Sequence, residues 1–292
     1  VGCWLGDLTD SPALGEVPVC QDMEEAIRAA KAQGGADVLV LATGSRVPEV
    51  LPQVLQAISH GLNVVSTAEE LTWPWLRHEG LAQEIDRRAK DNAVTVVGTG
   101  INPGFLLDLL VLVLCRPCQL VRRVTARRIV DVSLRRPQLQ HKVGSGLEQD
   151  EYRRLAAEGR IGHVGLGESA ALVAAGLGWP HEGVQECVEP VIAQAPSGTQ
   201  YVRIRPGQVM GSYQTARVTS TDGRCVELVC RMTHGEPEPR DEIIIEGDPP
   251  VHMRIEGGVF GDTATAGCTV NILRQVVAAR PGLLSVKDLP VA

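Results

Sequence analysis

The stretch VTVVGTGINPGF, residues 94–105, decides the fold that we predict for this chain. Its first four residues are rich in β-branched side chains and favour a buried strand, which ends in the turn Gly98-Thr99-Gly100. The apolar residues 106–114 then predict a helix. A strand that ends in glycines and opens onto a helix is typical of the ligand-binding edge of an open α/β sheet. Glycine lets the backbone approach a flat ligand there, and Pro103 stiffens the turn.

Two earlier segments repeat this arrangement of strand, polar loop and helix. Residues 36–42 and residues 63–66 each predict a short buried strand. Small polar or acidic residues follow these two strands, namely Thr43, Gly44, Ser45, Thr67, Glu69 and Glu70. Helical spacing over residues 22–33, 48–60 and 79–90 separates the strands, so we predict a Rossmann-like, doubly wound parallel sheet of α/β class. The strand ends meet at its carboxyl edge, where such folds bind ligands.

The second half of the chain has a different pattern. Residues 124–132 alternate apolar and polar side chains like a half-exposed strand, and turns rich in glycine and proline separate further strands. We predict these strands over residues 187–205, 209–218, 225–233, 242–246 and 251–255. Helices are expected over residues 148–159, 168–177 and 261–277, and a tail over residues 281–292. The second half is therefore predicted to be α+β with a mostly antiparallel sheet.

Composition and charge argue against several classes of protein. With 292 residues and 44% hydrophobic content, the chain can bury one large core or two moderate ones. The net charge of −7 argues against nucleic acid or an anionic membrane as the main partner. No apolar run reaches the ~18 residues of a membrane span, and no signal peptide is visible at Val1. Eight scattered cysteines predict reduced thiols in a cytoplasmic protein.

Several motifs together resemble a known family. They are VVSTAEELTWPW, GTGINPGFLLD, RRPQLQHKVGSGL, GRIGHVGLGES, EPVIA, RPGQVMG, GDTATA and PGLLSVKDLP. In this order, over nearly the whole chain, they resemble the 2,4-diaminopentanoate dehydrogenase family of the dihydrodipicolinate-reductase-like group, which includes native NAD(P)H-dependent amine dehydrogenases. The resemblance implies oxidative deamination or reductive amination of a small amine, keto or amino-acid substrate. It also implies NAD or NADP as the cofactor.

The resemblance further implies how the chain is divided. Residues 1–120 would form an NAD(P)-binding Rossmann-like domain, residues 121–270 an α+β substrate and dimerisation domain, and residues 271–292 a helix end and tail that packs back on the first domain. A homodimer is implied as well. The family's opening strand and Gly-rich turn are not visible after Val1, so we expect the first domain to be incomplete at its N-terminus. The residue that distinguishes NAD from NADP lies in that part of the fold, which leaves the choice between them open.

Glu69 and Glu70 are the candidate catalytic residues. Carboxylates favour a helix N-terminus, where the helix dipole stabilises them by about 0.3–1 kcal/mol, and this alone would explain one of them. The alternative is that a carboxylate at this edge binds the substrate ammonium and carries its proton as the C–N bond is oxidised. The resemblance implies that a glutamate of this loop is catalytic. The sequence does not separate the two residues.

The candidate cofactor-binding residues lie in the same three loops. We expect Asn102 or nearby backbone groups to bond the nicotinamide carboxamide, Gly104 to allow close approach and Phe105 to provide an apolar wall. The alternative is a helix-initiating turn with Asn102 as its cap. The full predicted set is Thr43, Gly44, Ser45, Thr67, Gly100, Asn102, Pro103, Gly104 and Phe105.

The candidate substrate-pocket residues are His163 and Glu168 in the motif GRIGHVGLGES. A lone histidine is more often structural than catalytic, but its place in a family motif favours His163 as a wall of the pocket. His141 and Lys142 are weaker candidates. Arg135 and Arg136 are consistent with a solvated basic patch.

Two other patterns are set aside, and two rival functions stay open. Residues 195–199, APSGT, copy the loop that binds substrate carboxylate in true dihydrodipicolinate reductases, but the His-His-rich segment of those enzymes and its lysine have no counterpart here. Cys115 and Cys118 have zinc-like spacing, but no second pair completes four ligands, so we predict no metal. The rival functions are reduction of a cyclic imine and a non-catalytic homologue that lacks the cofactor.

Overall fold

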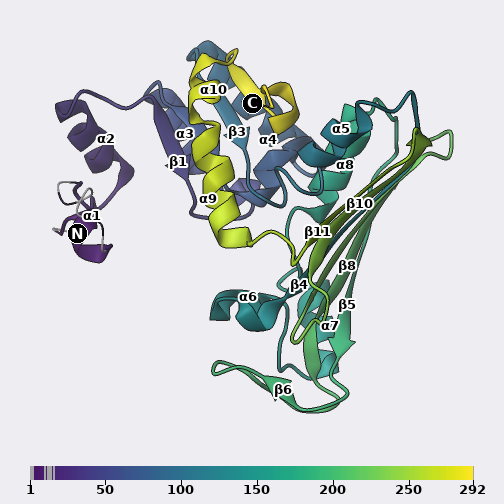
Figure 1. Ribbon diagram of the computed structural model, residues 1–292. Helices are drawn as coiled ribbons and strands as arrows, with labels where there is room; N and C mark the ends of the chain where they lie inside the picture. Colours follow the sequence, from purple (N-terminus) through teal and green to yellow (C-terminus); the bar gives the residue numbers. More distant parts are fainter. Residues whose placement is uncertain (1–2, 10, 12–14, 16, 292) are drawn as a thin grey trace.

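The computed structural model describes residues 3–9, 11, 15 and 17–291. The outermost bounds of the predicted domains, at residues 1 and 292, lie outside the described residues. A small sheet surrounded by helices forms one part of the molecule, and a long sheet extends away from it (Figure 1). In the described part of the chain, no helix has the length and apolarity needed to cross a membrane.

The first sheet is parallel, with four strands in the order β1-β2-β3-β12. The strands are β1 (Val38–Leu41), β2 (Asn63–Ser66), β3 (Thr95–Gly98) and β12 (Gly282–Leu284). The segment that we expected to be only a tail therefore contributes the strand beside β3. The predicted α/β class with a Rossmann-like parallel sheet is confirmed.

Both faces of this sheet are buried under helices. Val64 and Val96 point into a core cluster with α3 (Val47–Ser59) and α4 (Glu79–Asp91). The next residues along the same strands belong to a second cluster with α10 (Leu273–Ala278) on the opposite face. Successive side chains of a strand point to opposite faces, so strands covered on both sides are apolar throughout. This is why short runs of valine and leucine predicted the sheet correctly.

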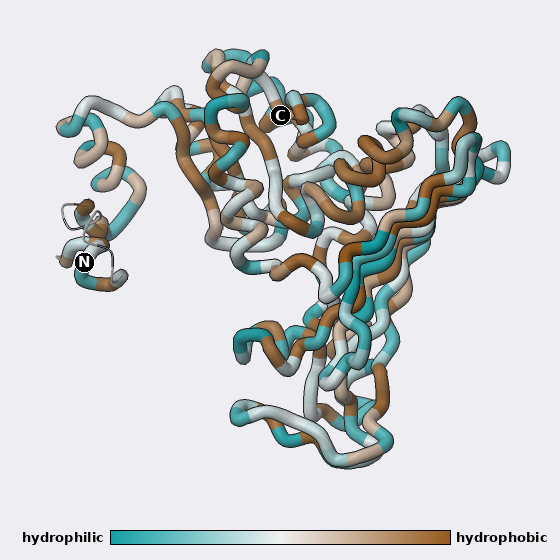
Figure 2. The backbone as a smooth tube through the Cα atoms, in the orientation of Figure 1, coloured by the Kyte–Doolittle hydropathy of each residue, from teal (hydrophilic) through white to brown (hydrophobic). Residues whose placement is uncertain are grey.

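The second sheet has six strands in the order β11-β10-β4-β9-β8-β5. They are β4 (Leu120–Asp131), β5 (Gln185–Ile192), β8 (Val209–Thr219), β9 (Cys225–Thr233), β10 (Arg240–Asp248) and β11 (Val251–Glu256). Helices α5 (Leu109–Cys115) and α8 (Leu166–Gly176) pack on one face and leave the other open (Figure 1). Hydrophobic and hydrophilic residues alternate along these strands, as expected for a sheet covered on one side (Figure 2).

Three details differ from the predicted elements. The sheet is mostly antiparallel, but β4 and β9 pair in parallel because the long segment between them crosses over through helices. The strand expected over residues 187–205 ends at Ile192, and a small hairpin of β6 (Ser197–Gly198) and β7 (Arg203–Ile204) follows. The helix expected from residue 106 begins at Leu109, because the Asp108 side chain accepts the Leu109 backbone N–H.

The remaining elements are short helices between the two sheets and around them. They are α1 (Leu5–Leu8), α2 (Met23–Ala32), α6 (Pro137–Lys142), α7 (Gln149–Ala157), α9 (Gly261–Asn271) and the 3₁₀ helices η2 (Glu69–Thr72), η3 (Pro74–Leu76), η4 (Val132–Leu134) and η5 (Val286–Asp288). The single helix predicted over residues 261–277 is thus two helices, α9 and α10. The chain passes from β11 through α9 back to the first sheet, which places α9 between the two parts of the molecule (Figure 1).

Candidate active site

Two neighbouring cavities lie where the two sheets meet. The first, which we call the sheet-edge cleft, measures about 820 Å³ and lies at the carboxyl ends of β1, β2 and β3. The second, which we call the inner cavity, measures about 200 Å³ and lies against β4 and α6. Glu69, Asn102 and Thr265 line both of them. The two cavities therefore share a border, and Glu69 and Asn102 lie on it.

The predicted cofactor-binding residues gather along the sheet-edge cleft with two exceptions. Those that line it are Thr43, Gly44, Ser45, Thr67, Gly100, Asn102 and Pro103. Gly104 lies behind them in a left-handed conformation with φ +119°, and a Cβ there would lie 2.4 Å from the Gly100 nitrogen. Phe105 packs against the main core cluster instead of lining the cleft. These two residues shape the turn without facing the space that a ligand would fill.

Asn102, which follows the first sheet, contacts His163, which lies in the segment between β4 and β5 of the second sheet. The Asn102 Nδ2 donates to Nε2 of His163 at 3.1 Å, which puts the ring proton on Nδ1. Burial, followed by the positive charges of Lys142 and Arg128, lowers the pKa of His163 to about 3, so the ring stays neutral near neutral pH. The Asn102 Oδ1 is buried and has no hydrogen-bond partner among the described residues. Asn102 thus offers a ligand one free acceptor at the border of the cavities.

Glu69 points to the border of the cavities from the first turn of η2. Its side chain is 21% exposed, and its Oε1 lies 3.6 Å from Nζ of Lys142. Gly165 packs closely behind it, since a Cβ on Gly165 would lie 3.0 Å from the Glu69 Cβ and 2.6 Å from Pro103 Cδ. The carboxylate can therefore reach a molecule in either cavity, with a lysine ammonium beside it.

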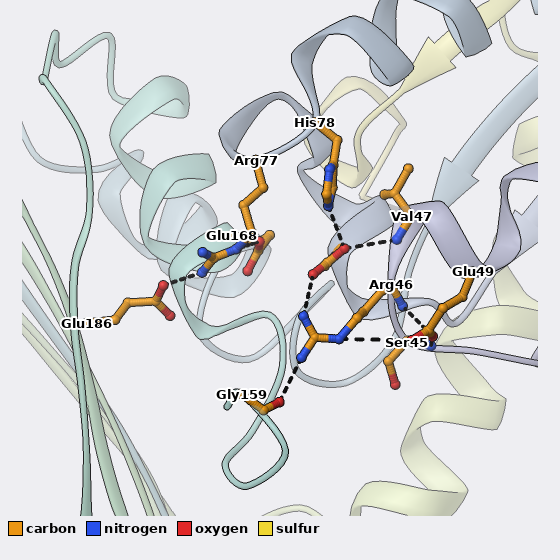
Figure 3. A network of polar contacts seen from close by, with 10 residues as sticks. Ser45, Arg46, Val47, Glu49, Arg77, His78, Gly159, Glu168 and Glu186 are labelled. Carbon is orange, nitrogen blue, oxygen red and sulfur yellow. Dashed lines mark hydrogen bonds and ion pairs between the residues drawn. The ribbon is translucent and has the colours of Figure 1, made fainter. Parts of the chain in front are cut away.

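Glu70, the other candidate, has a different environment. Its side chain is 3% exposed and lines neither the sheet-edge cleft nor the inner cavity. Its Oε2 accepts the Val47 N–H at 2.9 Å and lies 2.9 Å from the His78 Nε2, while its Oε1 lies 3.6 Å from Arg46. The labelled partners Arg46, Val47 and His78 surround one carboxylate in Figure 3. The structure thus gives these two neighbouring glutamates different environments, a difference that the sequence did not reveal.

Glu168 is a buried carboxylate that pairs with an exposed arginine, and it lines neither of these two cavities. It is 1% exposed, and its Oε1 accepts from Nε of Arg77 at 2.6 Å. Arg77 also pairs with Glu186 of β5, so these three residues join the end of η3 to the second sheet (Figure 3). Burial raises the pKa of Glu168, and the Arg77 charge opposes that shift. Of the two predicted substrate-pocket residues, His163 lines the inner cavity and Glu168 lies at the domain interface.

The inner cavity carries more positive than negative side chains. Its cationic lining residues are Arg128, Arg135, Arg136 and Lys142, and its acidic lining residues are Glu69 and Asp262. Arg128 is buried, lies 3.4 Å from Asp241 and donates to the Val259 carbonyl. Sequence reasoning missed Arg128, which looked like one residue of an alternating strand. The motif GDTATA contains Asp262 and Thr265, which also line the inner cavity, so the sequence offered a signal for this part of its wall.

The two patterns set aside in the sequence stay away from both cavities. Residues Ser197 and Gly198 form the small β6–β7 hairpin, which lies at the far end of the long sheet (Figure 1). Among the described residues, no group of three or more histidine, cysteine or acidic side chains is arranged to hold a metal ion. Cys118 instead donates to the Pro249 carbonyl.

Known proteins resemble this chain in sequence and in structure. Residues 105–292 match the family model described as the 2,4-diaminopentanoate dehydrogenase C-terminal domain. The chain is 34% identical over 266 residues to 2,4-diaminopentanoate dehydrogenase from Acetoanaerobium sticklandii, over 88% of this chain and 74% of that protein. A solved structure of an amine dehydrogenase from Mycobacterium smegmatis has 25% identity and a TM-score of 0.85, over 99% of this chain and 85% of that one.

These likenesses, together with the parallel sheet and the cleft at its edge, define a Rossmann-type dehydrogenase, an oxidoreductase. Within that class, the chain belongs to the 2,4-diaminopentanoate dehydrogenase family. The resemblance inferred from the motifs is confirmed. Membership in a family of dehydrogenases favours an enzyme over a non-catalytic homologue.

Proposed function

We propose that this protein oxidises the C–N bond of a small diamino acid with NAD or NADP as the hydride acceptor. The observation that carries the proposal is the shared border of the two cavities, where Glu69 and Asn102 both line the sheet-edge cleft and the inner cavity. The names of its relatives, 2,4-diaminopentanoate dehydrogenase and amine dehydrogenase, support this chemistry.

The sheet-edge cleft suits a nicotinamide ring beside Asn102. The buried Asn102 Oδ1, which has no partner among the described residues, would accept a hydrogen bond from the carboxamide N–H of the ring. Small residues such as Thr43 and Gly100 leave room for the adjoining ribose. When bound, the cofactor takes up hydride at C4 of the ring. The protein would place the substrate carbon against that atom and exclude water.

Glu69 would act on the amine from the border of the cavities. Its carboxylate would hold the substrate ammonium and take one proton from it, which frees the nitrogen lone pair as hydride leaves the neighbouring carbon. The carbon–nitrogen double bond that results is hydrolysed by water to a ketone and ammonia. Lys142, with its Nζ 3.6 Å from Glu69, would serve as a counter-ion to this carboxylate before the substrate enters. The neutral His163 forms the wall opposite.

Arg135 supports a diamino acid as substrate rather than a simple amine. It lines the inner cavity, and its guanidinium lies 3.9 Å from the centre of the Phe260 ring. Among the described residues, no carboxylate lies within salt-bridge distance of Arg135. Burial and the neighbouring Arg128 lower the pKa of Arg135, and the more distant carboxylates of Asp262, Asp241 and Asp131 only partly oppose that shift. A substrate carboxylate would supply that counter-ion.

Replacing Arg135 with methionine should separate acids from plain amines. Loss of a charged hydrogen bond to the substrate carboxylate is expected to lower kcat/KM for 2,4-diaminopentanoate by about 10–100-fold. Pentane-2,4-diamine, which lacks the carboxylate, should be oxidised equally well by the variant and the original enzyme. Arg122→Met, on the exposed start of β4, is the matched control. An equal loss for both substrates would contradict the assignment of Arg135 to the carboxylate.

We also propose that two copies of the chain pair through the open face of the second sheet. This face carries partly exposed apolar side chains such as Ile244 among ion pairs such as Arg127–Glu242 at 2.9 Å. No described helix covers it (Figure 1). A face with alternating charges and apolar patches can match its own copy across a twofold axis. Covering it would remove the apolar side chains from water.

Sedimentation of the purified protein tests this pairing. We expect a mass of twice the 31.3 kDa of one chain. Ile244→Arg, at a partly exposed position of the open face, should shift the equilibrium toward single chains because it buries an unpaired charge in the interface. Arg122→Met serves again as the unaffected control. A single-chain mass at every concentration would contradict the proposed dimer.

Binding of the cofactor tests the proposed function itself. The protein, expressed from its complete coding sequence, is titrated with NADH and with NADPH while tryptophan fluorescence is followed. Saturable quenching by either nucleotide, together with amine-dependent reduction of its oxidised form, is the expected result. Binding without turnover of any amine, but with turnover of a cyclic imine, would favour the rival reductase. Absence of binding by both nucleotides would refute the proposal.

A further inference from the structure

We infer that Glu70 is a positioning residue, which holds three active-site segments in one arrangement: the loop before α3, the helix η2 with Glu69, and the glycine-rich loop with His163. The inference rests on the proposed function in one respect, namely that Glu69 is the carboxylate that meets the substrate. It goes beyond that function because Glu70 itself touches neither the sheet-edge cleft nor the inner cavity.

One oxygen of the Glu70 carboxylate is held by two donors. At 2% exposure, the residue is closed off from solvent. Its Oε2 receives the backbone N–H of Val47, the first residue of α3, and lies 2.9 Å from Nε2 of His78. A carboxylate at the start of a helix also interacts favourably with the helix dipole. A group held by the backbone and by a side chain in this way cannot turn to a substrate without breaking these contacts.

The backbone of Glu70 adds a second link to the same loop. Its N–H donates to the Ser45 carbonyl at 3.1 Å. Ser45 and its neighbours Thr43 and Gly44 line the sheet-edge cleft. Glu69 is the residue directly before Glu70, so the catalytic carboxylate and the cofactor-side loop are tied through one residue. Movement of Glu70 would therefore displace both at once.

Arg46 extends the arrangement to the other domain. Its Nη1 lies 3.6 Å from the Glu70 Oε1, and its Nη2 donates to the Gly159 carbonyl at 2.8 Å (Figure 3). Gly159 begins the glycine-rich stretch that leads to His163 and Gly165. Gly165 packs directly against the Glu69 Cβ, so the path returns to the catalytic residue. We name Arg46, Val47, Glu70, His78 and Gly159 the Glu70 network.

Removing the Glu70 charge should loosen this network while leaving the reacting groups present. A glutamine at this site has nearly the same shape but would turn an amide N–H toward His78 or Arg46, which also donate. The buried donors would lose a charged acceptor, which costs more than loss of a neutral one. Glu69 itself is unchanged in this variant. We therefore expect the cofactor-side loop and Glu69 to be misplaced, which should weaken cofactor binding and slow turnover together.

The test compares Glu70→Gln with Glu69→Gln and with Glu84→Gln, a control that removes a partly exposed carboxylate paired with Arg88. Glu70→Gln is expected to raise the Kd for NADH by about tenfold and to lower kcat by about tenfold, as expected for loss of one charged hydrogen bond. The pH at which kcat falls should stay where it is in the original enzyme. Glu69→Gln should lower kcat without changing the Kd. Glu84→Gln should change neither constant.

A second variant guards against misfolding of the first. His78→Gln leaves the Glu70 carboxylate in place but removes one of its partners, and it should shift the same constants in the same direction by a smaller factor. Combined with Glu70→Gln, it should add little, because His78 acts through Glu70. Full additivity of the two changes would overturn the inference. So would a Glu70→Gln enzyme that binds NADH normally but has lost one limb of its pH profile, since Glu70 would then carry the proton.

Hydrogen–deuterium exchange keeps the inference separate from the proposed function. If the original protein neither binds NADH nor oxidises an amine, the proposed function fails on its own. The Glu70 network still predicts that Glu70→Gln speeds exchange in residues 43–47, 69–72 and 159–165 together, whereas Glu84→Gln leaves them unchanged. Faster exchange confined to residues 69–72, or none at all, would show that Glu70 does not join these segments.

Discussion

Replacing Glu69 with glutamine is expected to lower kcat for amine oxidation by about 10²–10⁴-fold, the usual contribution of a positioned acid or base. Glutamine keeps the size of the side chain but can neither hold a substrate ammonium as an anion nor accept its proton. The Kd for NADH should stay close to that of the original enzyme, because Glu69 meets the cofactor-side space only at its border. Steady-state rates with 2,4-diaminopentanoate and fluorescence titration with NADH measure the two quantities.

Two comparisons sharpen this expectation. Glu79→Gln removes an exposed carboxylate ten residues further along the chain, at the start of α4, and should leave kcat unchanged. Lys142→Met removes the ammonium that lies 3.6 Å from Glu69. The kcat of this variant tests whether that charge contributes to turnover. If Glu69→Gln retains normal turnover while Glu70→Gln loses it, the roles proposed for these two residues are reversed.

Replacing Gly98 with alanine is expected to cost stability and activity together. Gly98 ends β3, and a Cβ there would lie 2.4 Å from the Leu71 carbonyl carbon and 2.5 Å from the Thr72 nitrogen. Both atoms belong to the backbone of η2, so no side chain can move aside. Relieving the overlap requires η2 to shift, and Glu69 shifts with it. We expect a loss of about 2–3 kcal/mol in the free energy of unfolding, near the upper end for overpacking.

Gly80→Ala provides the matched control for this substitution. Gly80 lies in the first turn of α4, and nothing lies within 4 Å of its added Cβ. Alanine in an exposed helix should raise stability slightly, by up to about 1 kcal/mol. Urea unfolding of both variants, with kcat measured in parallel, makes the comparison. Equal urea midpoints for Gly98→Ala and Gly80→Ala would mean that β3 does not fix η2 as the structure indicates.

The first sheet could be predicted because its signals are local. The strands at residues 63–66 and 94–97 are covered on both faces, so each carries consecutive valines and is recognisable without knowledge of its partners. The strand β12 was missed for the opposite reason. This strand has only three residues, and it forms by pairing with β3, which lies far away along the chain.

The candidate site was predictable at the level of loops but not of individual side chains. Glu69 and Glu70 are neighbours in sequence but have different environments. The Glu70 carboxylate contacts the N–H of Val47, 23 residues away, and the ring of His78, and Glu69 contacts neither. Glu168 likewise pairs with Arg77 across 91 residues, a contact that the sequence did not predict. Contacts at such separations leave no trace in the local pattern, because each partner alone looks like an ordinary surface charge.

Transfer of deuterium tests the central claim most directly. The protein is incubated with oxidised cofactor and with 2,4-diaminopentanoate that carries deuterium on both amine-bearing carbons, and the reduced nicotinamide is analysed by mass spectrometry. Direct hydride transfer across the border of the two cavities predicts that deuterium is found on C4 of the nicotinamide ring. Reduced cofactor without deuterium, with the label released to water, would contradict the account.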